Sequence, residues 1–270
     1  YASFTDPSVS KLFIASIIPG IVLMLMFMFY IAIRALGGGV TSVAGSDSDE
    51  PRLSPMELIG DLLPFSVLIL VTLGSIYAGI ATPTEAAAIA CVASVIIGKI
   101  WGDLSLDRVK ESLISTVEIV GNILLIVLAA YLYAYAMSIS GAGKVIATWI
   151  GSMGLGYTEF LIALLIMYLV LGTFLDSMGM VILTVPVLYP VLMAYGVDLI
   201  WFGVFLVVAV EIGLLTPPVG MILFVIQGMT KATAKDVFMG ALPFFLVMVA
   251  FILMLLFVPD MALWLPGQMK

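Results

Sequence analysis

The sequence contains no histidine and only one cysteine, Cys91. These absences exclude a disulfide within the chain, a zinc site of Cys and His ligands, haem ligation by His and a Ser-His-Asp triad. Charged residues are also few, at 10% of the 270 residues, whereas soluble domains carry about 25%. Hydrophobic residues make up 63%, and the mean hydropathy is +1.28. We therefore expect an all-α integral membrane protein, a polytopic helical bundle.

The chain also lacks an initiator methionine and a recognisable signal segment. It begins at Tyr1, and no basic stretch with a cleavage site precedes the first apolar run. We therefore expect a fragment or the later part of a longer protein. The net charge is −7, but the acidic residues concentrate in one loop, so this charge indicates neither an acidic nor a basic partner. We expect no nucleic acid among the partners.

Apolar runs of about 20 residues predict helices that cross the membrane. Five runs are of this ordinary kind: Leu12–Arg34, Leu62–Ile80, Glu85–Trp101, Leu113–Ile139 and Val237–Val258. Pro19 and Gly20 predict a kink in the first run. Gly37–Pro55 holds three consecutive glycines followed by acidic residues, which predicts a solvated loop. Gly141–Tyr157 is Gly-rich and only partly apolar, which predicts an interfacial helix and turn.

The basic residues predict the orientation of the chain in the membrane. Alternating the spans places seven of them on one side: Arg34, Arg52, Lys99, Arg108, Lys110, Lys231 and Lys235. The other side receives Lys144 and Lys270. The positive-inside rule makes the first side cytoplasmic, so the C-terminus is predicted to lie outside.

Two further apolar segments are interrupted by residues that disfavour a regular helix, at Gly172–Gly179 and at Gly213–Gly220. Irregular backbone at membrane depth persists only where protein shields it or where it lines a water-filled cavity. Paired interruptions of this kind are typical of the central site of a secondary transporter. We therefore expect the chain to take part in transport.

Pro217 and Pro218 predict a break in the helix within Ile200–Gln227. Because proline has no N–H, the carbonyls of Gly213 and Leu214 lose their helical partners. The residue before each proline is also pushed away from the helical conformation. The helix should therefore stop near Gly213 and restart around Pro218. A proline kink with only a packing role is the alternative.

The two helix ends at this break would face one point with opposite chemistry. The free carbonyls lie at the negative end of the first half, which suits a small cation. The Thr216 hydroxyl can serve either a cation or an anion. The N–H groups at the start of the second half suit a carboxylate; they belong to Val219, Gly220 and Met221.

Asp176 lies midway through the apolar run Glu159–Tyr195. An acid at the centre of a bilayer costs about 2.5–3.5 kcal/mol and is therefore usually functional. Gly172 and Gly179 allow the chain to turn, and Asp176 or Ser177 can cap the second arm. This pattern predicts a re-entrant hairpin with a polar tip. The alternative is two ordinary spans joined by a surface turn, with Asp176 as an exposed N-cap.

Three further acidic residues have different expected roles. Thr82, Pro83 and Glu85 occupy the N-cap, N1 and N3 positions of a capping box that would open the following helix. We expect this motif to be mainly structural. Glu118 and Glu211 are candidate ion or proton ligands, with a bundle-facing acid bonded to a neighbouring hydroxyl as the alternative for each.

Several ordered motifs resemble the large membrane (M) subunit of TRAP transporters, the tripartite ATP-independent periplasmic systems. They are Leu12-Phe13 with Pro19-Gly20, Gly79–Ala88, Gly172–Asp176, Pro186 with Pro190, Phe202-Gly203, Glu211–Gly213 and Leu215–Gly220. The resemblance covers nearly the whole chain. It implies an ion-transporter fold of the elevator type with two inverted repeats. This chain looks like the second repeat together with the last span of the first.

On this resemblance the chain divides into five parts. Residues 1–34 form the last span of the first repeat, and residues 35–60 form the solvated loop. Residues 61–157 are scaffold-like helices with the interfacial helix. Residues 158–228 are the transport-core hairpin and the broken helix, and residues 229–270 are the final span and the external C-terminus.

The resemblance also implies a sodium-coupled importer of an organic acid, C4-dicarboxylates being one class, in the bacterial cytoplasmic (inner) membrane. A periplasmic substrate-binding (P) protein would deliver the acid, and a small membrane (Q) subunit would support the scaffold within the lipid. Sodium is the coupling ion, no other cofactor is expected, and the C-terminus would be periplasmic. The hairpin tip and the helix break would form one of two related half-sites. Its sodium ligands would be Gly172, Asp176, Gly213, Leu214 and Thr216, and its substrate contacts Thr173, Ser177, Val219, Gly220 and Met221.

Other classes of protein fit the sequence less well. An ion channel predicts a continuous polar pore, and the sequence has no charged motif of the kind that forms a ring. An intramembrane enzyme needs a second acid or a His at a suitable spacing from Asp176, and none stands out, so we expect no enzyme. Another ion-coupled organic-anion transporter of related fold is the main alternative.

Overall fold

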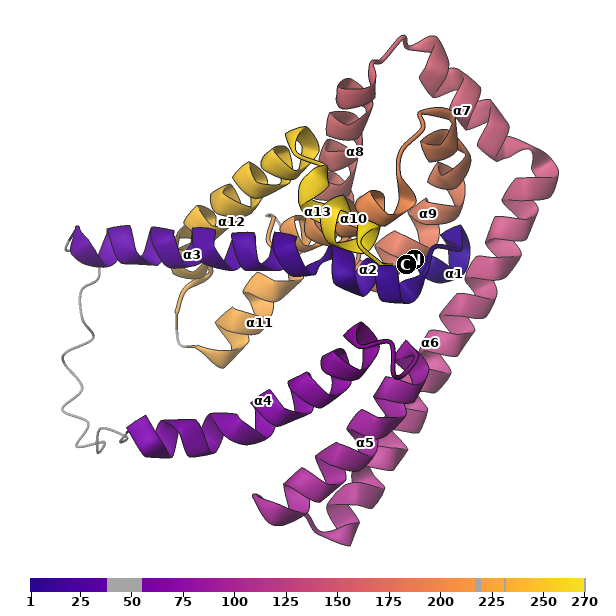
Figure 1. Ribbon diagram of the computed structural model, residues 1–270. Coiled ribbons are helices and arrows are strands. Elements are labelled where there is room, and N and C mark those ends of the chain that lie inside the picture. The colour runs from indigo at the N-terminus through magenta and orange to yellow at the C-terminus, as the bar shows by residue number, and fades with distance from the viewer. Residues whose placement is uncertain (38–54, 217–219, 231, 270) are drawn as a thin grey trace. The chain divides into compact units, whose positions relative to one another are not determined.

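The computed structural model describes residues 1–37, 55–216, 220–230 and 232–269. Over these residues the chain forms α-helices and no β-strand, which confirms the expected all-α class (Figure 1). The helices are α1 (Ala2–Thr5), α2 (Val9–Ala15), α3 (Ile17–Leu36), α4 (Pro55–Tyr77), α5 (Pro83–Ile100), α6 (Leu106–Ser140), α7 (Ala142–Ser152), α8 (Tyr157–Gly172), α9 (Ser177–Ala194), α10 (Leu199–Leu214), α11 (Met221–Met229), α12 (Ala234–Phe257) and α13 (Asp260–Gly267).

Several of these helices are suited to a membrane. Within the described ranges, five helical stretches are long and apolar enough to cross one. The number becomes six if α7 and α8, which bend by 120° at a short break, count as one span. Large apolar side chains are exposed along the helices, as at Phe29, Leu125 and Ile139. Exposed apolar surface on this scale marks contact with lipid or with partner chains.

The chain divides into two compact units. Unit 1 comprises Tyr1–Arg34 and Val127–Lys270, and unit 2 comprises Ala35–Ile126. In unit 2, α4 packs against α5. In unit 1, the core surrounds α10, which contacts α2, α8, α9, α12 and α13 (Figure 1).

The sequence of α10 explains why this helix occupies the core of unit 1. Its residues are apolar on nearly every face, and Trp201, Phe202, Phe205 and Ile212 are almost completely buried. A helix that is apolar all round belongs inside a bundle. Because lipid is as apolar as these side chains, close fit and dispersion hold such helices together in a membrane. Small residues on α10 therefore become important, because they allow neighbouring backbones to approach.

The helix bounds differ from the sequence prediction in ways that have local causes. The break in the first span falls at Ser16, because Pro19 has no N–H for the carbonyl of Ala15, where α2 ends. The helices α4 and α6 begin before their apolar runs, at Pro55 and Leu106, because a helix continues past the stretch that needs an apolar environment. The helix α13 was not predicted.

Two predictions about the connections have different outcomes. The Gly37–Pro55 loop lies largely outside the described residues. The stretch Gly141–Tyr157 does form a short helix, α7, followed by a turn in which Gly154 has φ 66°. The position of α7 at a membrane interface, the five-part division of the chain and its orientation stay predictions.

Candidate functional site

Two glycines join α8 to α10 where both helices end. A Cβ built on Gly172 would lie 2.4 Å from the Cα of Gly213. A Cβ built on Gly213 would lie 2.8 Å from the carbonyl oxygen of Tyr168. Real Cβ atoms essentially never approach other atoms so closely, so this contact requires glycine on both sides. The start of the hairpin tip (Gly172–Ser177) and the end of α10, where the helix break (Gly213–Gly220) begins, are therefore in contact, although they are far apart in the sequence.

The helices α8 and α10 run in the same direction, so their C-terminal ends lie together. Near their N-terminal ends, the ring of Phe160 in α8 stacks on Tyr195, which precedes α10, with centroids 4.2 Å apart. At the other ends Gly172 meets Gly213. Each helix carries about half a negative unit charge at its C-terminus. Two such ends side by side favour a cation.

A threonine hydroxyl follows each of these helix ends. Thr173 Oγ1 donates to the Val170 carbonyl at 2.7 Å, and Thr216 Oγ1 donates to the Ile212 carbonyl at 2.8 Å. A hydroxyl whose only proton is used in this way keeps lone pairs that accept. Thr173 is buried and Thr216 is half-buried. Both oxygens are thus preset as acceptors, either for a hard cation or for a donor on a bound molecule.

The carbonyls at the end of α10 differ from the prediction in one detail. The Gly213 carbonyl accepts the N–H of Thr216 at 3.0 Å, so the prediction that it has no partner is wrong. The chain tightens into a three-residue turn here, which satisfies a carbonyl that a regular helix would have bonded to position 217. Leu214 is the last residue of α10.

The predicted interruption of the second segment is confirmed. The helix α10 ends at Leu214 and α11 begins at Met221. Pro217, Pro218 and Val219 lie outside the described residues. The restart is later than predicted, because Gly220 has φ 38° and ψ 79°, a left-handed conformation that a right-handed helix cannot include.

Gly220 is the N-cap of α11, and no side-chain cap is formed there among the described residues. The first N–H groups of a helix have no partner within the helix. The backbone of Gly220 and Met221 therefore directs donors and a positive dipole end toward the helix break. Gly220 is buried, so its N–H is shielded from bulk water.

Asp176 is the N-cap of α9, which confirms the predicted capping role. Its Oδ2 accepts the N–H groups of Met178 at 3.1 Å and Gly179 at 3.2 Å. A Cβ built on Gly179 would lie 2.8 Å from Oδ1, so the cap also explains why this position is glycine. Within this chain Asp176 and Ser177 are exposed, as the surface-turn alternative expects.

The two other candidate acids, Glu211 and Glu118, are both exposed within this chain. Glu211 is exposed and stands two residues before Gly213, which places it about 200° around the axis of α10. It therefore points away from the contact with Gly172. Glu118 is exposed on α6, within unit 2. Both stay candidates only.

The capping box at the start of α5 is confirmed. The N–H of Thr82 donates to Glu85 Oε2 at 2.8 Å, and the N–H of Glu85 donates to Thr82 Oγ1 at 3.3 Å. Pro83 occupies the first helical position. The side chains of Thr82 and Glu85 each accept a backbone N–H that would otherwise lack a partner at the start of α5, so the motif has a structural explanation.

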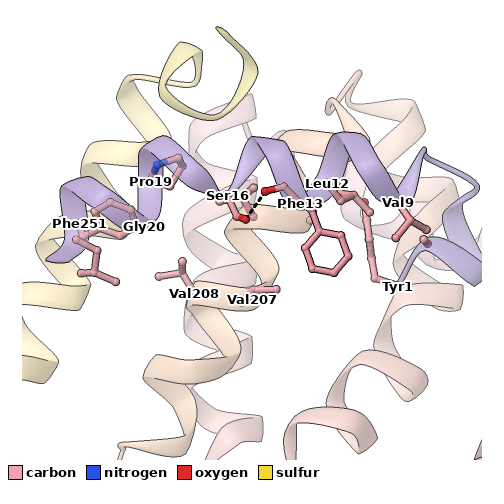
Figure 2. A pocket seen from close by; sticks show the side chains of 14 residues that line it. Tyr1, Val9, Leu12, Phe13, Ser16, Pro19, Gly20, Val207, Val208 and Phe251 are labelled. Atoms are coloured by element: carbon pink, nitrogen blue, oxygen red, sulfur yellow. Dashed lines mark hydrogen bonds between the residues drawn. The ribbon is translucent and has the colours of Figure 1, made fainter. Parts of the chain in front are cut away.

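An apolar pocket of about 570 Å³ borders the middle of α10, not its end. Figure 2 shows Ser16, Phe13, Val207 and Val208 around it. The protons of its two hydroxyl groups are already donated to backbone carbonyls. Ser16 donates to the Phe13 carbonyl at 2.7 Å, and Tyr1 donates to the Leu199 carbonyl at 2.6 Å. An ionised acid would lose its hydration there without a charged partner. The pocket therefore does not suit a carboxylate substrate.

One residue near the tip escaped the sequence analysis. Tyr168 is fully buried one turn before Gly172, and its hydroxyl lies 2.7 Å from Thr184 Oγ1 on α9. The available signal was the four-residue spacing from Tyr168 to Gly172, which places both on one face of α8. The partner on α9 could not be read from the sequence, because it depends on how the two arms fold together.

Comparisons with known proteins agree with one another. A family model described as "Tripartite ATP-independent periplasmic transporter, DctM component" matches residues 1–261. A C4-dicarboxylate TRAP transporter large permease protein DctM from Pseudomonas aeruginosa is 32% identical over 268 residues, covering 99% of this chain and 62% of that protein. The protein of the same name from Rhodobacter capsulatus is 33% identical over 264 residues, covering 97% and 59%.

An isethionate TRAP transporter permease protein DctMQ from Oleidesulfovibrio alaskensis is 29% identical over 272 residues. That match covers 99% of this chain and 42% of the relative. The chain thus spans about three fifths of the length of the two DctM relatives, and less of DctMQ.

Proposed function

The chain belongs to the DctM component family of tripartite ATP-independent periplasmic transporters, and we propose that it forms part of the large permease of a sodium-coupled importer of an organic acid. The observation that carries this proposal is the backbone contact between Gly172 and Gly213, which brings two interrupted segments together and so supports a shared site. As a membrane permease, it would bind and move its cargo without changing it chemically.

Sodium suits the donor set at the paired C-terminal ends of α8 and α10. The candidate ligands are oxygens, which hard cations prefer. Within the described residues, no group of three or more His, Cys, Asp or Glu side chains gathers into a site for a transition metal. A monovalent cation needs fewer charged ligands, and carbonyls, hydroxyls and one carboxylate can hold it. We propose that these come from Gly172, Asp176, Gly213, Leu214 and Thr216; the Gly213 carbonyl, which already accepts one N–H, would bind the ion through its second lone pair.

The start of α11 suits the carboxylate of the substrate. A helix N-terminus without a side-chain cap offers both N–H donors and a positive dipole end. Gly220 and Met221 lie there, and Val219 precedes them outside the described residues. Thr173 donates its proton to the Val170 carbonyl, so it would accept a hydrogen bond from a substrate hydroxyl, and we propose Ser177 as a second contact. The C4-dicarboxylates in the names of the DctM relatives support an acid of this class.

The coupling of sodium entry to uptake of the acid follows from the charge of the ion. Sodium entering across 100 mV gains about 2.3 kcal/mol, in addition to its concentration gradient. Binding at the hairpin tip and the helix break would order the site, so that the loaded and empty states differ in their ability to move. The close packing of α8 on α10 supports movement of the tip and the break as one body, as an elevator mechanism requires.

The partners follow from the family. We propose a small membrane (Q) subunit and a periplasmic (P) protein that delivers the acid to the bacterial inner membrane, where the C-terminus of this chain would face the periplasm. The name of the DctMQ relative, which joins M and Q, supports the small subunit.

Uptake by the complete transporter tests this function. Asp176→Asn and Thr216→Ala should each raise the sodium concentration for half-maximal uptake about tenfold, because each loses one of few ion ligands. Asparagine is as good an N-cap as aspartate, so Asp176→Asn should leave the melting temperature unchanged. Unchanged sodium dependence in both variants would show that the proposed sodium site is wrong.

A further inference from the structure

Tyr168 and Thr184 form a hydrogen bond whose direction is fixed by a third group. Thr184 Oγ1 donates its only proton to the Met180 carbonyl at 2.7 Å. The 2.7 Å contact between the two hydroxyls must therefore carry the proton of Tyr168. Tyr168 is completely buried and Thr184 is partly buried. The tyrosine hydroxyl thus connects α8 to α9 away from bulk water.

The same tyrosine also contacts α10. Its carbonyl oxygen lies against Gly213, 2.8 Å from where a Cβ would stand. Tyr168 therefore belongs to the first arm of the hairpin, bonds the second arm through its side chain, and supports the end of α10 through its backbone. The hairpin tip begins one turn after it, at Gly172.

We infer that Tyr168 is a positioning residue that holds the hairpin tip against the end of α10 in the sodium-binding arrangement. This inference rests on the proposed function. Tyr168 is not assigned as an ion ligand, since its hydroxyl is buried against Thr184 on α9, below the tip. Its effect is indirect: it fixes the separation of α8 and α9 below the tip, and hence where Asp176 stands relative to Gly213.

The variant Tyr168→Phe isolates this effect from folding. Thr184 keeps its own bond to Met180, so no buried hydroxyl loses its last partner, and the aromatic ring stays in place. Only the connection between the two arms is removed. A hydrogen bond of this kind is worth about 0.5–1.5 kcal/mol, which corresponds to a threefold to tenfold shift in an equilibrium.

The readout is the sodium-dependent labelling of a cysteine at the tip in the complete permease, with sodium ions alone as the probe. The background carries Cys91→Ser, which removes the only cysteine of this chain, with any cysteine elsewhere in the permease also replaced. Met178→Cys then places the label site at an exposed position beside Asp176. The rate of maleimide labelling is measured against sodium chloride, with potassium chloride keeping the ionic strength constant.

Four variants of this background separate positioning from general destabilisation. Tyr168→Phe and Thr184→Val should each raise the sodium concentration for half-maximal protection about threefold to tenfold. Thr184→Ser keeps the hydroxyl and should restore the wild-type value. Tyr195→Phe is the matched control: it loses a tyrosine hydroxyl bond to the Leu155 carbonyl at the far end of α9, about 25 Å from Met178 at 1.5 Å per residue. It should leave sodium protection unchanged.

The possible failures are distinguishable. If the unmodified background shows no sodium-dependent protection, the proposed sodium site is wrong and the inference is lost with it. If that background responds to sodium but Tyr168→Phe and Thr184→Val do not shift the response, only the positioning role is overturned. An equal shift in Tyr195→Phe would likewise overturn it, because the effect would then be one of overall stability.

Discussion

The two helices that follow the interruptions, α9 and α11, begin in opposite ways. The N-terminus of α9 is closed by the carboxylate of Asp176, which accepts two N–H groups. The N-terminus of α11 begins at Gly220, which has no side chain to offer. A fixed charge therefore lies at the first helix start, whereas no side chain caps the second among the described residues. The two helix starts thus differ in that only the first has a side-chain cap over the part of the chain that the structure describes.

The ends that precede the interruptions are alike. Both α8 and α10 stop at or near a glycine, and both are followed by a threonine whose hydroxyl bonds back to a carbonyl. The glycines allow the two ends to meet. The comparison teaches that cation binding would be shared between the interruptions, whereas anion binding would belong to the second alone.

The largest expected effect on the free energy of unfolding comes from forcing the C-terminal ends of α8 and α10 apart. Gly172→Ala would place a Cβ 2.4 Å from the backbone of Gly213, and backbone on both sides leaves no flexible atom to move. We expect the free energy of unfolding to fall by about 3 kcal/mol, the upper part of the range for overpacking. Thermal unfolding of the purified permease and uptake should both show the loss.

Gly240→Ala is the control for that substitution. Gly240 lies inside α12 with no atom within 4 Å of a built Cβ. Because alanine favours helix over glycine by up to about 1 kcal/mol, this variant should be as stable as the wild type or more so. Wild-type stability in Gly172→Ala would show that the two helix ends are not in contact.

A smaller effect should follow from closing the second helix start in the way that the first is closed. Gly220→Asp would put a carboxylate at the N-terminus of α11, whereas Gly220→Asn has nearly the same shape without the charge. Both residues tolerate left-handed backbone better than most, so the strain is similar. At substrate concentrations below saturation, we expect uptake by the Asp variant to be about tenfold lower than by the Asn variant, since a charge difference of this kind is worth about 1.4 kcal/mol. Equal uptake by the two variants would show that the substrate carboxylate does not bind at the N-terminus of α11.

The smallest effect should come from the capping box in unit 2. Thr82→Ala loses the cap of α5 and should cost about 1 kcal/mol in the free energy of unfolding. Glu85→Gln keeps the pattern of a capping box and should cost less. Neither should change the sodium concentration for half-maximal uptake. A shift in that concentration would show that this motif takes part in ion binding after all.

The sequence was most informative where a single residue type decides the local conformation. Proline predicted that the helix would stop near Gly213, and it ends at Leu214. The Thr82, Pro83 and Glu85 spacing predicted the capping box. The apolar runs predicted the long helices, although not their ends, because helix continues into polar residues that hydropathy does not mark.

What the sequence did not show depends on contacts between distant segments. Nothing in the spacing from Gly172 to Gly213 predicts that they touch, because that contact follows from α8 and α10 packing in parallel. The same holds for Tyr168 and Thr184. The conformation of Gly220, and with it the later start of α11, depends on how the chain leaves the break, which the helix-breaking rules for proline do not specify.

The central claim is that the hairpin tip and the helix break bind one sodium ion together. The most direct test is a double-mutant cycle on the sodium concentration for half-maximal uptake, with Asp176→Asn from the tip and Thr216→Ala from the break. If both oxygens serve one ion, the second substitution should have little further effect after the first, with a coupling energy of about 1 kcal/mol or more. If the two effects simply multiply, the tip and the break act separately, and the claim is contradicted.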